Sequence, residues 1–181
     1  MKRKGLLLGA ALVVVLLAVP IASNAANTGI MPLGDQISGQ MQEMKQSSWE
    51  LRKTADRLHA ITRGGGHTWQ THSSYLTTAK ENVNQLGKML ASMEDFKQHG
   101  TKLQQRAIEC MRPQLVQTAM SLTRAIDLLN DRRQNVYFSD YREQVQAVSE
   151  QSESLHELLD AVLKYEAAKA RVEGLELEPT A

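Results

Sequence analysis

Hydrophobic and small residues recur at alternating spacings of three and four in long stretches of this chain. Residues 35–63 carry Ile37, Met41, Met44, Ser48, Leu51, Ala55 and Leu58 at these spacings. Residues 68–99 carry Leu76, Ala79, Val83, Leu86, Leu90 and Met93. Such spacing places one narrow stripe along one side of an α-helix. The pattern therefore predicts two long amphipathic helices.

Two further helices follow from the second half of the chain. Residues 140–172 have the most regular stripe, formed by Tyr141, Val145, Val148, Ser152, Leu155, Leu159 and Val162. Residues 101–132 have a less regular one, formed by Leu103, Ala107, Ile108, Met111, Leu115, Ala119, Leu122, Ile126 and Leu129. Pro113 lies inside that helix, and we expect a kink there rather than a break because the stripe continues on both sides. Residues 173–181 are expected to form a flexible tail.

Three consecutive glycines separate the first two helices. Gly64, Gly65 and Gly66 would lose much backbone entropy inside a helix, but they suit a reversal in which φ is positive. Thr68 is then expected to cap the second helix. Gly100 is expected to end that helix at the C′ position, and Thr101 opens the third with the spacing of a capping box.

Four amphipathic helices joined by short connections predict an all-α fold. We expect an up-down-up-down antiparallel four-helix bundle with long coiled-coil-like helices. Antiparallel packing of the first and fourth helices would place Asp35 level with about Val172, and Arg63 level with about Asp140. Periplasmic sensor bundles have a similar architecture, but no motif supports that resemblance, so it implies no function.

The first 25 residues have the pattern of a signal peptide. Lys2, Arg3 and Lys4 precede an apolar run from Gly5 to Val19, and small residues precede a cleavage point after Ala25. Residues 26–34 would then be a short lead-in. The alternative is an uncleaved anchor helix, although the apolar run is shorter than the ~20 residues that a span needs. We therefore expect a periplasmic or secreted protein whose leader is cleaved, and contact with a membrane only in the alternative case of an uncleaved leader.

The charge balance argues against a nucleic-acid partner. The leader contains three basic residues and no acidic one, so its removal changes the formal charge from +1 to −2. No basic stripe of the kind that binds nucleic acid is present. Cys110 has no partner within the chain; it is expected to act as a small hydrophobe, with an intermolecular disulfide as the alternative. A homodimer is left open because a long stripe can also pair with a second chain.

Two segments resemble the Glu-x-x-His motif of di-iron bundles. Glu153 precedes His156, and Asp56 precedes His59, at the required spacing. In the expected register the two histidines lie ~18 Å apart along the bundle axis, too far to share a metal pair. No Cys-x-x-Cys-His haem motif, catalytic triad or phosphate loop is present. We expect no cofactor and no enzymatic activity.

One end of the expected bundle collects unusual side chains, because the first and third connections lie at the same end of an up-down bundle. The weak candidates for metal binding are His59, His67 and His72. The candidates for an interaction surface are Trp69, Tyr75, Arg133, Tyr137, Phe138 and Tyr141. In the alternative interpretation, the two tyrosines at positions 75 and 141 only close the end of the core.

These features favour a binding protein over an enzyme. The first hypothesis is an exported, non-enzymatic helical-bundle protein that binds a partner protein or a component of the cell envelope. The alternative is a periplasmic bundle that binds a small ligand or a metal through the end that contains histidine and aromatic residues.

Overall fold

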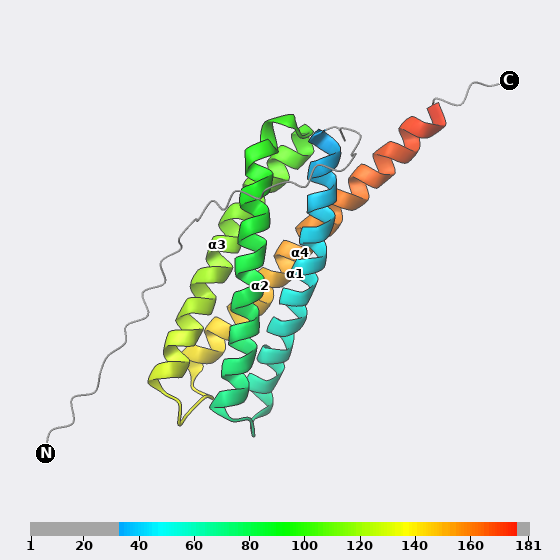
Figure 1. Ribbon diagram of the computed structural model, residues 1–181. Coiled ribbons are helices and arrows are strands. Elements are labelled where there is room, and N and C mark those ends of the chain that lie inside the picture. The colour runs from blue at the N-terminus through cyan, green and yellow to red at the C-terminus, as the bar shows by residue number, and fades with distance from the viewer. Residues whose placement is uncertain (1–32, 177–181) are drawn as a thin grey trace, which may run out of the picture. The chain divides into compact units, whose positions relative to one another are not determined.

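The computed structural model describes residues 33–176, and its regular structure is helical throughout (Figure 1). The elements are α1 (Leu33–Gly64), α2 (Trp69–Phe96), the short 3₁₀ turn η1 (Lys97–His99), α3 (Lys102–Asp131) and α4 (Ser139–Glu176). The expected leader, nearly all of the lead-in and residues 177–181 lie outside this range. Within it, no helix is both long and apolar enough to cross a bilayer.

The helices bury their stripes against one another. α1 contacts α2 and α4, and α3 contacts the same two helices. Every stripe residue predicted for the first, second and fourth helices is buried, which confirms those three patterns. In α3 the core contains Thr118 and Ala125, whereas Ala119 and Ile126 are only half-buried. The hydroxyl of Thr118 donates to the carbonyl of Gln114 at 2.9 Å, so a polar residue can occupy the stripe.

α1 and α4 run in opposite directions along each other. Lys45 Nζ lies 2.5 Å from Asp160 Oδ1, and Arg52 Nη2 lies 3.0 Å from Glu153 Oε1. The residue numbers rise in α1 as they fall in α4, close to the register expected from the sequence. Hydrogen bonds from Lys164 and Lys45 lower the pKa of Asp160 to about 2. These exposed ion pairs set the register and add little stability, since each contributes ~0–1 kcal/mol.

The glycine turn has the conformation that the sequence predicts. Gly64 is the last residue of α1, and Gly65 and Gly66 follow with φ values of 72° and 81°. Thr68 then caps α2 by accepting the N–H of Thr71 at 3.5 Å. Only glycine adopts such positive φ values without a steric penalty, so the reversal depends on these two positions.

The connection between α2 and α3 differs in one respect from the prediction. Thr101 and Gln104 form the expected capping box, with hydrogen bonds of 3.2 and 2.9 Å. Gly100, however, has a φ of −79°, so it is not a left-handed C′ glycine. A Cβ there would come within 2.9 Å of both Ile37 Cδ1 and Gln104 Oε1. Close packing against α1, rather than backbone conformation, therefore explains this glycine.

α3 (Lys102–Asp131) continues through Pro113 without a break. The proline side chain is exposed, and the residues on either side of it in the stripe, Met111 and Leu115, are buried. Burial of the stripe on both sides holds the helix together across the missing N–H.

The flexible tail predicted from residue 173 is wrong for residues 173–176, because α4 continues to Glu176. Residues 167–174 are helical although they are all exposed (Figure 1). If the spacing of the buried stripe continued after Val162, its next positions would be Glu166, Lys169 and Glu173, which are charged. The helix therefore leaves the core but persists, because it is rich in alanine and Lys169 pairs with Glu173 at 3.6 Å. We call residues 167–176 the overhang.

Candidate functional site

Two loops distant in sequence are joined through a single tyrosine. The hydroxyl of Tyr137, in the α3–α4 loop, accepts a hydrogen bond from the backbone N–H of His67 at 2.6 Å. The same hydroxyl donates to the carbonyl of His67 at 2.9 Å. The two loops therefore lie together, as the sequence pattern predicts. We call residues 65–69 and 132–141, with His72, the loop end.

Arginine side chains cover two aromatic rings at the loop end. The guanidinium of Arg133 lies 4.8 Å from the ring centroid of Trp69, and that of Arg132 lies 4.8 Å from the ring centroid of Phe138. Both arginines are exposed and both rings are half-buried. Such cation–π contacts contribute ~0.5–1 kcal/mol each at exposed sites, enough to restrict the orientation of long side chains. Together with Tyr137, these four residues form what we call the aromatic–arginine surface.

Tyr141 does not belong to this surface, so its prediction as an interaction residue is wrong. Its side chain is fully buried, and burial raises the pKa of its hydroxyl. Its hydroxyl lies 3.0 Å from His72 Nδ1. The ring closes the end of the core, which was the alternative interpretation. Tyr75 is half-buried and also packs against the core.

The candidate metal ligands are not gathered into a site. His72 is fully buried, and its pKa is lowered by burial and then by the nearby His67. Its Nδ1 is engaged by Tyr141, and its buried Nε2 has no hydrogen-bond partner within residues 33–176. The side chain of His67 is exposed, whereas His59 is half-buried on α1. Across the described residues, no three His, Cys, Asp or Glu side chains come together as metal ligands would.

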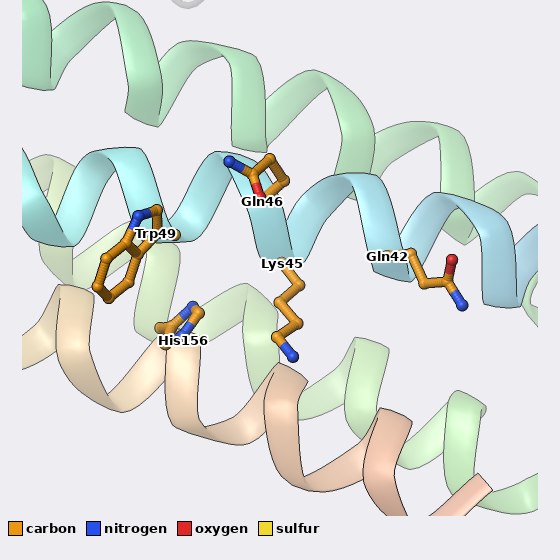
Figure 2. Close-up of a pocket in the computed structure, with 5 residues that line it drawn as sticks. All are labelled: Gln42, Lys45, Gln46, Trp49 and His156. Atoms are coloured by element: carbon orange, nitrogen blue, oxygen red, sulfur yellow. The ribbon is translucent and has the colours of Figure 1, made fainter. Parts of the chain in front are cut away.

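A second surface feature lies between α1 and α4, away from the loop end. An open groove there is lined by Gln42, Lys45, Gln46, Trp49 and His156 (Figure 2). Figure 2 shows Trp49 and Lys45 extending from α1 toward α4, with His156 beside the indole. The ring centroids of Trp49 and His156 are 5.6 Å apart. The sequence pattern did not indicate this groove, because Trp49 lies one position outside the buried stripe and belongs to no motif.

The pairing of Ser48 with His156 in this region is structural. Ser48 Oγ lies 2.9 Å from His156 Nδ1 and donates its own hydrogen to the carbonyl of Lys45 at 2.7 Å. When the hydroxyl donates to Lys45, the imidazole donates to it from Nδ1, and the pair then ties α1 to α4 as a structural contact. Ser48 is also fully buried, out of reach of a substrate. His156 is level with Ser48, which places it about 17 Å along the axis from His59.

Comparisons with known proteins give no match: no protein-family model, curated protein or solved structure resembles this chain. The argument for function therefore rests on the geometry of the surface itself. Among the described residues, the loop end is where aromatic and arginine side chains from two loops meet at one face.

Proposed function

We propose that this protein is an exported, non-enzymatic binding module. In this proposal the chain is an up-down-up-down four-helix bundle with coiled-coil-like helices, and its loop end binds a partner protein or a component of the cell envelope. The observation that supports the proposal most is the aromatic–arginine surface. Trp, Tyr and Arg are the residues that contribute most to protein interfaces, and here they are already oriented before any partner binds.

Preorganisation is the main reason to prefer the loop end over other surfaces. The double hydrogen bond of Tyr137 to His67 fixes one loop on the other. Arg133 is stacked on Trp69, so neither side chain would lose much freedom on binding. By contrast, exposed Val116 and Met120 lie on α3 alone, where no contact of either side chain with an aromatic or arginine side chain of another described element orders them in the same way.

A bundle that binds a metal or a small ligand is the weaker candidate. His72 is buried and hydrogen-bonded, so it offers no ligand atom to solvent. The groove beside Trp49 is open rather than enclosed, whereas small-molecule sites bury most of their ligand. The Ser48 and His156 pair lacks the geometry of an activated nucleophile, which favours the non-enzymatic proposal.

Export is the part of the proposal that rests on sequence alone. Lys2, Arg3 and Lys4, followed by the apolar run, have the pattern of a cleavable leader. N-terminal sequencing of the protein recovered from cell fractions should give a chain beginning at Ala26 in the exported fraction. A full-length chain that stays with the membrane would instead support the uncleaved anchor.

Binding at the loop end can be tested with two paired variants. Trp69→Ala combined with Arg133→Ala removes the central contact of the aromatic–arginine surface. Val116→Ala combined with Met120→Ala is the control, since it removes two exposed apolar side chains from α3, outside the aromatic–arginine surface. The protein should retain a discrete component from its native envelope extract, and only the first variant should lose at least ~90% of it, as expected for a loss above ~1.4 kcal/mol. Equal retention by both variants would contradict the proposal.

A further inference from the structure

α4 carries a second apolar stripe on the side that faces away from the core. Ala161, Tyr165, Ala168 and Val172 follow each other at spacings of four, three and four, and Leu158 precedes them by three. Tyr165 is 60% exposed and Val172 is 55% exposed. The stripe has the heptad spacing of a helix–helix interface. Its members from Ala161 to Val172 are exposed, whereas Leu158 at its start is half-buried and also packs against the edge of the core.

The residues beside this stripe are charged in a particular order. Glu157, Lys164 and Arg171 recur every seven residues along one edge of it. Glu157 and Arg171 are exposed, and neither forms an ion pair within residues 33–176. The edge therefore begins with an acid and ends with a base. When such an edge packs against an antiparallel copy of itself, the acid of each copy lies opposite the base of the other.

We propose that the stripe is the contact surface for a second copy of this chain, packed antiparallel along α4. The symmetry would be two-fold, so each contact occurs twice. Ala161 would face Ala168 of the second copy, Leu158 would face Val172 of the second copy, and the two Tyr165 rings would meet at the axis. The alanines allow the two helices to approach closely.

The same register pairs the charges along the edge. Glu157 lies opposite Arg171 of the second copy, and the two-fold axis repeats this pair. Lys164 meets its own equivalent, but each Lys164 already lies 2.7 Å from Asp160 of its own chain, which reduces the repulsion. A parallel arrangement would instead place Lys164 beside Lys169 of the second copy and would leave Glu157 without a basic partner. Charge complementarity thus favours the antiparallel dimer.

The size of the stripe sets the expected affinity. From position 158 to position 172 it covers about 21 Å of helix, and two of its five side chains are alanines. It is therefore smaller than a standard interface, which buries ~800 Å² per partner. We expect a dimer that forms at micromolar or higher concentration. Its two loop ends would point away from each other, so the dimer would be bivalent if the loop end binds a partner.

Charge reversal tests this interface. Sedimentation equilibrium in reductant, over roughly 10 to 1,000 µM protein, should show a monomer–dimer equilibrium for the wild type. Glu157→Arg and Arg171→Glu should each weaken dimerisation about tenfold, because each creates two like-charge contacts. The double variant should restore the wild-type constant. Glu81→Arg, on exposed α2 surface, is the control and should change nothing.

Three outcomes would overturn the dimer. The wild type could remain monomeric at every concentration, the two single variants could dimerise normally, or the double variant could fail to recover. All three altered positions are exposed and outside the core, so each variant should keep the helical circular dichroism of the wild type. The assay contains no envelope partner, so its outcome is independent of the proposal about the loop end.

Discussion

The loop end and the overhang lie at opposite ends of α4, and they are built in contrasting ways. At the loop end, Tyr141 and Val136 are buried, and Tyr137 joins two loops that are 70 residues apart in sequence. In the overhang, residues 167–174 are all exposed. The contrast shows that helix formation and tertiary packing are separate properties of this chain. A helix persists in the overhang because its composition favours it, whereas long-range contacts organise the surface at the loop end.

The sharpest test of this contrast compares two tyrosines of the same helix. Tyr141→Ala removes a fully buried ring and should lower the free energy of unfolding by about 3–5 kcal/mol. Tyr165→Ala removes an exposed ring from the outer face of α4 and should change the free energy by less than about 0.5 kcal/mol. Urea denaturation at protein concentrations below the micromolar range, where the proposed dimer is dissociated, measures both. A similar decrease in the free energy of unfolding for both variants would contradict the contrast between the packed loop end and the exposed face of α4.

The glycine turn gives the second-largest expected effect. Gly65→Ala and Gly66→Ala should each cost about 1–2 kcal/mol, because both residues have positive φ. Gly64→Ala is the matched control: it lies within α1, a Cβ there meets no atom within 4 Å, and alanine should stabilise the helix by up to about 1 kcal/mol. In thermal melts, Gly65→Ala and Gly66→Ala should have lower melting temperatures than the wild type, and Gly64→Ala should have an equal or higher one. A destabilising Gly64→Ala would show that the helix does not extend to this residue.

Removal of the Tyr137 hydroxyl should destabilise the loop end, but by less than the glycine substitutions destabilise the turn. Tyr137→Phe deletes both hydrogen bonds to the backbone of His67 and should cost about 1 kcal/mol, since each bond is partly exposed to water. Tyr75→Phe serves as the control, because no hydrogen bond of its hydroxyl occurs within the described part of the chain. Hydrogen exchange should also rise at the N–H of residue 67 in Tyr137→Phe. An unchanged exchange rate there would mean that the loops do not depend on this contact.

Acid should weaken the loop end through His72. Burial lowers the pKa of this imidazole in the folded state, so the unfolded chain binds the proton first as the pH falls below about 6.5. The resulting effect on stability is absent at pH 7, where the ring is neutral in both states, and grows until the pH reaches the lowered folded pKa. In urea denaturation at a series of pH values, His72→Gln should reduce the pH dependence of the free energy of unfolding between about pH 6.5 and the lowered folded pKa. The Asp160 carboxyl affects stability at lower pH. Because its pKa in the folded state is about 2, the ionised carboxyl stabilises the fold above about pH 4, and this contribution is lost as the pH falls toward 2.

The helical part of the fold could be predicted from the spacing of apolar residues alone, because narrow stripes must be buried together. That reasoning also located the loop end, since it needs only the order of helices and loops. It placed Tyr141 both in the stripe of the fourth helix and among the interaction candidates, because a tyrosine at the start of a helix can either close a core or face water. Burial of Val136 and of Thr118 was not predictable, because one lies in a loop and the other is a polar residue that satisfies its hydroxyl locally.

The last four residues of the overhang, 173–176, were assigned to a flexible tail for a related reason. The core stripe ends at Val162, and Gly174 with Pro179 has the composition of a helix end. Alanine content and the ion pair between Lys169 and Glu173 extend the helix beyond the core, and a pattern search for buried positions cannot detect this. The outer stripe from Ala161 to Val172 was missed because its members are small or weakly apolar.

The central claim, that the loop end is the binding surface, is tested most directly by photo-crosslinking in the native envelope. A photoreactive residue would replace Gln70, an exposed position next to Trp69, or Met120, which is 67% exposed on α3. If the loop end binds the partner, position 70 should give a discrete adduct that disappears when Trp69→Ala is added, and position 120 should give no adduct. No adduct from position 70, or the same adduct from both positions, would contradict it.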